Sequence, residues 1–281
     1  MSLAEFLKSK AVESFAAIKV ENCLPCNMRL YNELPEGCYA VFMLFPYYPK
    51  NKNSRLAAFA SVPDYHLFSR ELFSQMAEYI NEKYPGSYAR GFADHSPLDE
   101  RDGAAKCSLG IIGRHGLLIS EKYSSFICIG EFICSLTEDE LISEGIEIRN
   151  EEIKYCENCG KCVEACPGKC ADGDKSTCIS AINQKKGVLT EAETEAIRQS
   201  GSIWGCDVCQ NACPHTHRAM KEGTLYSTIP FFRENALTGD EKTVEALTDE
   251  EYSRYTFSYR KRNVMQRNID IIKGGKEDSY G

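Results

Sequence analysis

The sequence lacks the features of a membrane or secreted protein. No apolar run among its 281 residues reaches the ~18–20 residues that a membrane-spanning helix needs, so we expect no membrane segment. No N-terminal signal peptide is visible, and the 15 cysteines therefore indicate a reducing cytoplasm, where thiols stay available to bind metal. A framework of disulfides is disfavoured for the same reason.

An excess of positive charge is also missing. Lys and Arg total 33 against 41 Asp and Glu, which gives a net charge of −8. This balance disfavours non-specific attraction to nucleic acid, although a local basic patch remains compatible with it. The length allows one or two domains, and an apolar content of 43% is sufficient for a sizeable core.

Cysteine is abundant, and much of it falls into two runs between residues 155 and 214. The first run is C-x2-C-x2-C-x3-C-P and the second is C-x2-C-x3-C-P; together they contain Cys156, Cys159, Cys162, Cys166, Cys206, Cys209 and Cys213. The first run is the signature of bacterial two-cluster ferredoxins, in which the fourth cysteine ligates the other cluster. Two-residue gaps let a turning backbone direct successive thiolates at one cluster, and the three-residue gap carries the next thiolate away.

Two [4Fe–4S] clusters need about eight thiolates, four each, and the two runs supply seven. We expect cluster one to bind Cys156, Cys159, Cys162 and Cys213, and cluster two to bind Cys166, Cys206 and Cys209. From spacing alone the eighth ligand is either Cys170 or Cys178, which both lie between the runs. A pair of structural zinc sites is the alternative, but zinc takes four ligands in two separated pairs, and seven interleaved cysteines fit this poorly.

Hydrophobic patterns predict the main elements of the first half of the chain. They indicate an amphipathic helix at residues 3–18, a buried strand at Tyr39–Phe45, a long helix from Pro63 to Ile80, a strand at 126–136 and a solvated acidic linker at 138–152.

Asp94 is the candidate catalytic acid. A short strand leads to it, and the following Ser96-Pro97-Leu98-Asp99 predicts a helix start with Ser96 as N-cap and Asp99 at the capping-box position. Asp94 therefore lies between a strand end and a helix N-terminus, a common place for a working carboxylate, although turn-forming aspartates are commoner still. The glycines of 109–118 do not match G-x-G-x-x-G, but they allow close backbone approach to a large flat ligand.

These motifs, in this order, resemble the tRNA epoxyqueuosine reductase family, whose members carry cobalamin and two four-iron clusters. The resemblance covers roughly residues 40 to 270. It rests on Phe59-Ala60 with Asp64-Tyr65-His66, Asp94-His95-Ser96-Pro97 with Glu100-Arg101, the segment 109–115, Gly130-Glu131, Cys178-Ile179-Ser180, and Gly205-Cys206-Asp207 with Cys209-Gln210.

The resemblance implies an α+β protein with three parts. Residues 1–149 would form a nitroreductase-like, cobalamin-binding catalytic domain, residues 150–217 a ferredoxin-like domain with two [4Fe–4S] clusters, and residues 218–281 an extension that packs on them. It also implies that Cys178 is the eighth cluster ligand. The residues implied at the cofactor are Ala57, Phe59, His66, Asp94, Gly113, His115, Leu118 and Gly130.

The implied reaction is the reductive removal of an epoxide oxygen, from epoxyqueuosine to queuosine in tRNA. Two one-electron clusters would conduct electrons from an external low-potential donor, and cobalamin would carry the difficult redox step. Asp94 would deliver a proton, provided that desolvation raises its pKa towards neutrality. His66 and His115 are the alternative acids.

The sequence also departs from the family. Ile111, Arg114 and His115 replace the tryptophan, lysine and asparagine of the segment beside the corrin, and the chain ends soon after Arg267-Asn268. We therefore expect most of the family's C-terminal helical repeat to be absent. The alternatives are a cobalamin-dependent reductase of a small molecule, a ferredoxin-type electron-transfer protein and a corrinoid-reducing protein.

Net charge disfavours tRNA as a partner but does not exclude it, so any RNA-binding face must be local. The candidate basic residues are Arg254, Arg260, Lys261, Arg262, Arg267, Lys273 and Lys276. An ordinary solvated helix face is the alternative explanation for this segment.

Overall fold

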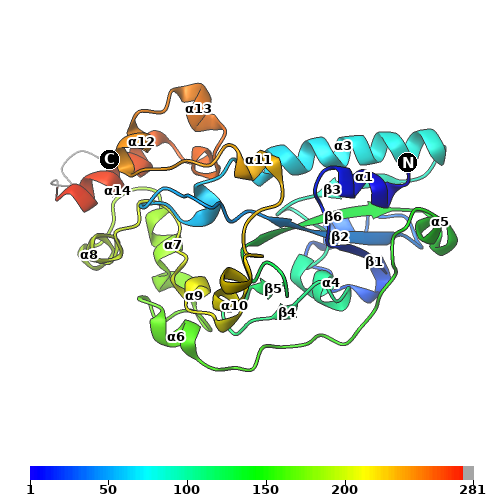
Figure 1. Cartoon of the computed structure of the whole chain (residues 1–281), viewed down its shortest axis with the longest axis horizontal. Helices are drawn as coiled ribbons and strands as arrows, with labels where there is room; N and C mark the ends of the chain where they lie inside the picture. Colours follow the sequence, from blue (N-terminus) through cyan, green and yellow to red (C-terminus); the bar gives the residue numbers. More distant parts are fainter. Residues whose placement is uncertain (275–281) are drawn as a thin grey trace. The chain divides into compact units, whose positions relative to one another are not determined.

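The computed structural model describes residues 1–274, and the chain clusters into two compact units (Figure 1). Unit 1 comprises Met1–Pro46, Tyr65–Gly113 and Leu117–Glu157. Unit 2 comprises Tyr47–Asp64, Arg114–Gly116 and the chain from Asn158 onward. The compact units therefore divide the chain differently from the three ranges expected from the sequence. No helix among residues 1–274 is long and apolar enough to cross a bilayer.

Unit 1 is built on a four-stranded antiparallel sheet in the order β1-β2-β6-β3, so the expected α+β class is confirmed. Its strands are β1 (Phe15–Lys19), β2 (Tyr39–Pro46), β3 (Ala89–Phe92), β6 (Ile127–Cys134) and the small pair β4 (Ile111–Ile112) and β5 (Leu118–Ile119). Its helices are α1 (Leu3–Ser9), α2 (Met28–Tyr31), α3 (Tyr65–Lys83), α4 (Glu100–Lys106) and α5 (Glu138–Ser143), with a 3-10 turn at Val20–Asn22.

Helices cover both faces of this sheet because β2 is apolar on both sides. Every residue of β2 is buried, and successive side chains point to opposite faces. Phe42 points towards α4, where a side chain on Gly103 would come within 2.1 Å of its ring. Phe45 points towards α3, and its ring lies 6.4 Å from that of Phe73. On that side α3 lies so close to the sheet that a Cβ on Gly91 would come within 2.1 Å of Phe73. The strand predicted at Tyr39–Phe45 and the helix predicted after Pro63 are therefore both present.

The helix predicted at residues 3–18 is wrong beyond its first two turns. Ser2 and Glu5 form a capping box that starts α1, but the backbone at Ala11 is left-handed, with φ of 61°. Residues Phe15–Lys19 then pair with β2, with Phe15 opposite Met43. Strand pairing with a fully buried neighbour overrides the helical spacing of the apolar residues.

Two further predictions, the cap of the helix after Asp94 and the acidic linker, differ from the structure. Asp99, and not Ser96, caps α4, since the Asp99 carboxylate accepts from the backbone N–H groups of Arg101 and Asp102. The acidic run is not only a linker, because Thr137 starts α5 with a capping box. The run also contains the fully buried Glu144.

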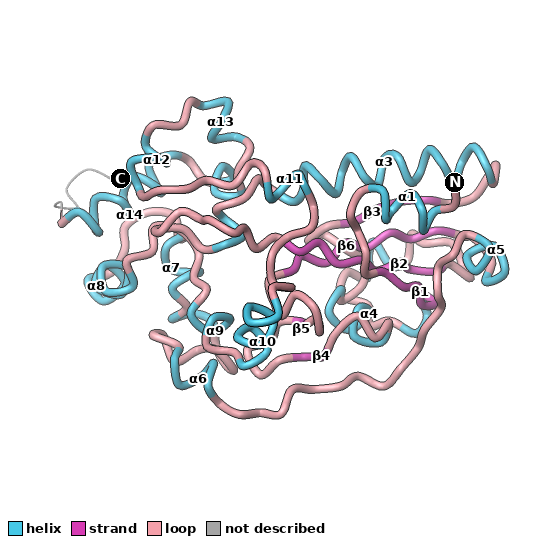
Figure 2. Tube along the Cα trace, viewed as in Figure 1, coloured by secondary structure: helices cyan, strands magenta, loops and turns pink. Residues whose placement is uncertain are grey.

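Unit 2 consists of short helices joined by loops (Figure 2). They are α6 (Lys161–Ala165), α7 (Ile179–Asn183), α8 (Glu191–Ser200), α9 (Val208–Asn211), α10 (Pro214–Glu222), α11 (Pro230–Arg233), α12 (Glu241–Glu245), α13 (Asp249–Ser253) and α14 (Arg262–Lys273), with 3-10 turns at Ala58–Ala60, Lys175–Thr177 and Thr256–Tyr259.

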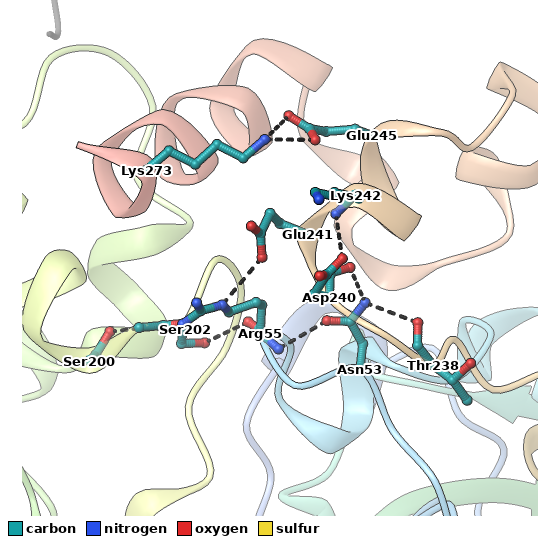
Figure 3. A network of polar contacts seen from close by, with 11 residues as sticks. Asn53, Arg55, Ser200, Ser202, Thr238, Asp240, Glu241, Lys242, Glu245 and Lys273 are labelled. Atoms are coloured by element: carbon teal, nitrogen blue, oxygen red, sulfur yellow. Dashed lines mark hydrogen bonds and ion pairs between the residues drawn. The ribbon is translucent and has the colours of Figure 1, made fainter. Parts of the chain in front are cut away.

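A fully buried Trp204 lies at the centre of one core of unit 2. Its ring makes edge contacts with Phe257 and Tyr259 at centroid distances of 6.2 and 5.9 Å. Asn53 joins the segment 47–64 to the chain before α12, because its side-chain amide donates to the carbonyl oxygen of Asp240 at 2.6 Å (Figure 3). These contacts explain why residues 47–64 belong to unit 2.

Candidate functional site

Asp94 follows β3 in unit 1 and has a left-handed backbone with φ of 60°, which aspartate tolerates better than most residues. Its Oδ2 lies 3.2 Å from Nε2 of His66, and the Tyr65 hydroxyl also hydrogen-bonds the carboxylate. Tyr65 and His66 are the first two residues of α3. The Asp94 and His66 side chains are 68% and 38% exposed, so this acid–histidine pair is accessible.

The pKa of Asp94 does not shift in the direction we expected. The hydrogen bond from His66 holds the pKa of Asp94 below its ordinary value; desolvation opposes this effect and the Tyr65 hydroxyl reinforces it. The expected upward shift is therefore wrong, and Asp94 is ionised at neutral pH. It can donate a proton only after it has taken one up.

The carboxyl group of Glu100 lies beside Asp94, and a second one, that of Glu131, lies close to Glu100. Glu100, the first residue of α4, accepts a hydrogen bond from the backbone N–H of Asp94. Glu131, on β6, is fully buried, and its Oε2 accepts the Ser96 hydroxyl at 2.5 Å. The Oε1 atoms of both glutamates are buried and have no hydrogen-bond partner among residues 1–274.

Burial makes both of these glutamates neutral. Desolvation raises the pKa of Glu100 to about 8, and the negative charge of Asp94 acts in the same direction. Desolvation raises the pKa of Glu131 well above its ordinary value, although the Ser96 hydroxyl opposes this. An ionised carboxylate with an unpartnered buried oxygen is costly, so both groups retain a proton at neutral pH.

Sequence reasoning missed the role of Glu131, although a signal was present. Glu131 is the single charged residue in the strand ICIGEFIC, and it pairs in register with Phe42 and Phe92. It therefore points to the sheet face that α4 covers. A charged residue amid apolar strand residues is rarely buried without a specific reason.

The residues expected to contact cobalamin are divided between the units. His66, Asp94, Gly113, Leu118 and Gly130 lie in unit 1, whereas Ala57, Phe59 and His115 lie in unit 2.

Two of the glycines near this set have a packing role. A Cβ on Gly130 would lie 2.5 Å from the Phe45 ring, and one on Gly110 would lie 2.6 Å from the carbonyl oxygen of Ile119. Close packing against other parts of the same chain thus explains why both positions are glycine. His115 is buried, and desolvation lowers its pKa to about 4, so it is neutral at pH 7 and a poor alternative to Asp94 as an acid.

The four cysteines expected at the second cluster come together in unit 2. Desolvation raises the pKa of Cys209 to about 12, and the neighbouring Cys206, Cys166 and Cys178 act in the same direction. The same two thiols, Cys178 and Cys166, also act on Cys206. These four side chains therefore lie near one another in unit 2, and their joint binding of one cluster stays a prediction.

Hydrogen bonds outside the cysteines fix the position of Cys206. Asn183 both donates to the carbonyl oxygen of Gly205 and accepts from its N–H, at 3.0 and 3.1 Å. The buried carboxylate of Asp207 accepts the backbone N–H of Ala58 at 2.8 Å. Gly205 has a φ of 74°, and a Cβ there would lie 2.5 Å from that of Ala57. The Gly-Cys-Asp motif therefore holds the cysteine through its two neighbours.

The cysteines expected at the first cluster belong to both units, unlike those expected at the second cluster. Cys159, Cys162 and Cys213 belong to unit 2, where Cys162 and Cys213 are buried and Cys159 is exposed. Cys213 directly precedes Pro214 and caps α10. Cys156 belongs to unit 1, where its backbone N–H donates to Ile112 at 3.0 Å. The shared binding of one cluster by these four residues stays a prediction.

Several of the candidate RNA-binding residues form hydrogen bonds or ion pairs within the protein. Arg267 is buried, and its guanidinium donates to the carbonyl oxygens of Lys185 and Gly187 at 2.9 and 2.7 Å. The side-chain amide of Asn268 donates to the carbonyl oxygens of Asn183 and Ile203. The Arg267-Asn268 pair thus anchors α14 to two loops of unit 2.

Other basic residues of this segment form ion pairs. Arg262 binds Asp249, with an Nε–Oδ1 distance of 2.9 Å, and Lys273 contacts both carboxylate oxygens of Glu245 at 2.8 Å (Figure 3). Lys276 lies outside the described residues. Arg260 also has a partner within the protein, since its Nε donates to the carbonyl oxygen of Gln184 at 3.0 Å. Among the described residues, the remaining candidates for contact with RNA are Arg254 and Lys261.

Comparison with known proteins agrees with the motifs. Residues 155–216 match the family model of the 4Fe-4S double cluster binding domain. The epoxyqueuosine reductase of Gloeobacter violaceus is 29% identical over 245 residues, which cover 82% of this chain and 73% of the relative. That of Cyclobacterium marinum is 28% identical over 256 residues, covering 86% and 78%.

Solved structures show the same fold. A crystal structure of selenomethionine-labelled epoxyqueuosine reductase superposes with a TM-score of 0.73 at 19% identity, covering 95% of this chain and 79% of that one. A structure of epoxyqueuosine reductase with an epoxyqueuosine-modified tRNA-Tyr stem loop gives the same TM-score, identity and coverage. The resemblance inferred from the motifs is confirmed. The chain is an iron–sulfur oxidoreductase homologous to the epoxyqueuosine reductases, with their α+β fold and a 4Fe-4S double cluster binding domain.

Proposed function

We propose that this protein reduces epoxyqueuosine to queuosine in tRNA, with two [4Fe–4S] clusters and cobalamin as cofactors. The observation that carries the proposal is that one chain combines a double-cluster domain with an exposed acid–histidine pair beside two protonated carboxyl groups. The first feature supplies single electrons and the second supplies protons. A pure electron-transfer protein would need only the first.

The stoichiometry of the reaction explains why both are needed. Removal of an epoxide oxygen as water consumes two electrons and two protons and leaves a carbon–carbon double bond. The two clusters accept one electron at a time from an external low-potential donor and pass them on. Bound cobalamin would supply the redox chemistry at the carbon–oxygen bond. The residues of this chain must then bind the substrate and deliver the protons.

The chemistry of the residues in unit 1 suits a large organic cofactor. Leu118 is buried in the apolar core of unit 1, whereas Asp94 and His66 keep polar atoms accessible. Few placed polar groups beside apolar residues are compatible with a cofactor site. We propose that these residues and Gly113 meet cobalamin from unit 1.

Asp94 is the proposed proton donor to the departing oxygen. Because it is ionised in the free protein, it must take up a proton before each transfer. Glu100 accepts a hydrogen bond from the backbone N–H of Asp94 and retains its proton up to about pH 8, so it adds no second negative charge beside Asp94. Glu131 lies behind it as a second protonated group. A positioned acid contributes about 10²–10⁴-fold to the rate of such a step.

Transfer RNA is the proposed substrate carrier because the relatives are named for epoxyqueuosine, and one solved neighbour contains a modified stem loop. Reduction of a small-molecule epoxide is the second candidate. It is favoured by the engagement of Arg262, Arg267 and Lys273 in contacts within the protein.

The deciding experiment uses anaerobically reconstituted, cobalamin-loaded protein with a low-potential reductant. It is incubated separately with epoxyqueuosine tRNA and with free epoxyqueuosine nucleoside, and queuosine is measured by mass spectrometry. Conversion of the tRNA supports the proposal. Conversion of the nucleoside alone would replace tRNA with a small molecule, and conversion of neither would reject the reaction.

A further inference from the structure

A fifth cysteine lies at the second cluster. The buried Cys170 has its Sγ 3.6 Å from Sγ of Cys166, a distance at which one thiol can donate a hydrogen bond to the other. Cys170 also interacts directly with Cys178. It therefore contacts two of the four cysteines expected to bind this cluster.

The loop between Cys166 and Cys178 is built to keep Cys170 in this place. The Thr177 hydroxyl donates to the carbonyl oxygen of Gly168 at 2.7 Å and closes the loop. A Cβ on Gly168 would lie 2.0 Å from the carbonyl oxygen of Thr177, so only glycine permits this closure. Lys175 adds a second clamp, because its ammonium group donates to the carbonyl oxygen of Cys170 at 2.8 Å.

Five thiols around a site for four leave one thiol over. A [4Fe–4S] cluster takes one thiolate for each iron, and hydrogen bonds to the cluster sulfurs are one of the factors that set its reduction potential. A thiol held against a ligating sulfur, with no iron of its own, is such a hydrogen-bond donor. Because reduction adds negative charge to the cluster and its thiolates, a donor at this point favours the reduced state.

We propose that Cys170 is not a cluster ligand but donates a hydrogen bond from its thiol to the cluster-bound sulfur of Cys166, and thereby raises the reduction potential of the second cluster. The donor is buried, so it stabilises the reduced cluster without admitting water. This role concerns electron entry into the protein and is independent of the substrate.

The test is an EPR-monitored redox titration of the anaerobically reconstituted full chain. C170A removes the donor, C170S keeps a hydroxyl donor in its place, and C134A is the control for loss of a buried thiol in unit 1. All three variants should retain about eight irons, the content of two four-iron clusters. The potential of one cluster should shift to lower values in C170A and stay near the wild-type value in C170S and C134A.

Two results would overturn the proposal. Loss of about four irons in C170A would show that Cys170 is itself a ligand, and an unchanged potential in a fully loaded C170A would show that it donates nothing. If C170A fails to assemble any cluster, C170V takes its place as the variant without a donor: a lowered potential supports the proposal, and an unchanged potential contradicts it. A C170S that lacks the second cluster also contradicts it. None of these readouts involves tRNA, so a failure of the proposed function would leave this result unaffected.

Discussion

Replacement of Asp94 by asparagine should separate catalysis from stability. The side chain is 68% exposed and its histidine partner 38%, and exposed ion pairs contribute about 0–1 kcal/mol to folding. Asparagine also tolerates the left-handed backbone that Asp94 adopts. We therefore expect Asp94→Asn to change the free energy of unfolding by less than about 1 kcal/mol.

The same substitution removes the proton that the reaction needs. Loss of a positioned acid lowers the rate by about 10²–10⁴-fold, which corresponds to about 3–5 kcal/mol in the activation barrier. The catalytic effect should thus exceed the effect on folding several-fold. Iron content and cobalamin binding should remain at wild-type levels, since no cluster cysteine is touched.

The assay is conversion of epoxyqueuosine tRNA by reduced holoprotein, measured beside urea-induced unfolding. Asp99→Asn is the matched control, because asparagine caps a helix about as well as aspartate and Asp99 caps α4 close to the site. Its turnover should stay within a few-fold of the wild type. A nearly normal turnover in Asp94→Asn would refute the reasoning and shift the role of acid to His66.

The remaining predictions concern protonation, the cluster, packing and RNA. Because the pKa of Glu100 is raised from 4.5 to about 8, its buried carboxyl costs stability as pH rises through that window, and Glu100→Gln should remove this loss, measured by urea-induced unfolding at several pH values. Turnover in the variant should lack the decline that we expect of the wild type above about pH 8, where Glu100 becomes charged. Cys178→Ser should lose the second cluster or leave a three-iron form, seen by EPR. Arg267→Lys should reduce the free energy of unfolding by about 2–4 kcal/mol, because two carbonyl groups lose their shared donor. Charge reversal at Arg254 and Lys261 should flatten the salt dependence of tRNA binding, and an unchanged slope would place the RNA-binding face elsewhere.

The cluster motifs could be predicted because the ligands are encoded by local spacing. Gaps of two and three residues between cysteines constrain the chain whatever surrounds it, and residues 155–216 indeed match a double-cluster domain. The strand β2 could be predicted equally well, because a continuous apolar run must be buried on both faces. Neither inference required knowledge of distant contacts.

Features that depend on a partner distant in the sequence could not be predicted from the sequence. Ser96 looks like a helix cap, but its hydroxyl donates to Glu131, and the cap passes to Asp99. The pKa of Asp94 falls because His66, far away in sequence, donates to it. Arg267 looks like a residue for RNA, but two loop carbonyls bind it. In each case the sequence showed the right residue, and a long-range hydrogen bond decided its role.

The most direct test of the account is a single turnover without excess reductant. The cobalamin-loaded protein is reduced, freed of reductant and mixed anaerobically with an epoxyqueuosine-modified stem loop, while EPR follows the clusters and mass spectrometry follows the product. The account predicts one queuosine formed for every two electrons lost from the protein. Oxidation of the clusters without queuosine, or queuosine without loss of cluster electrons, would contradict it.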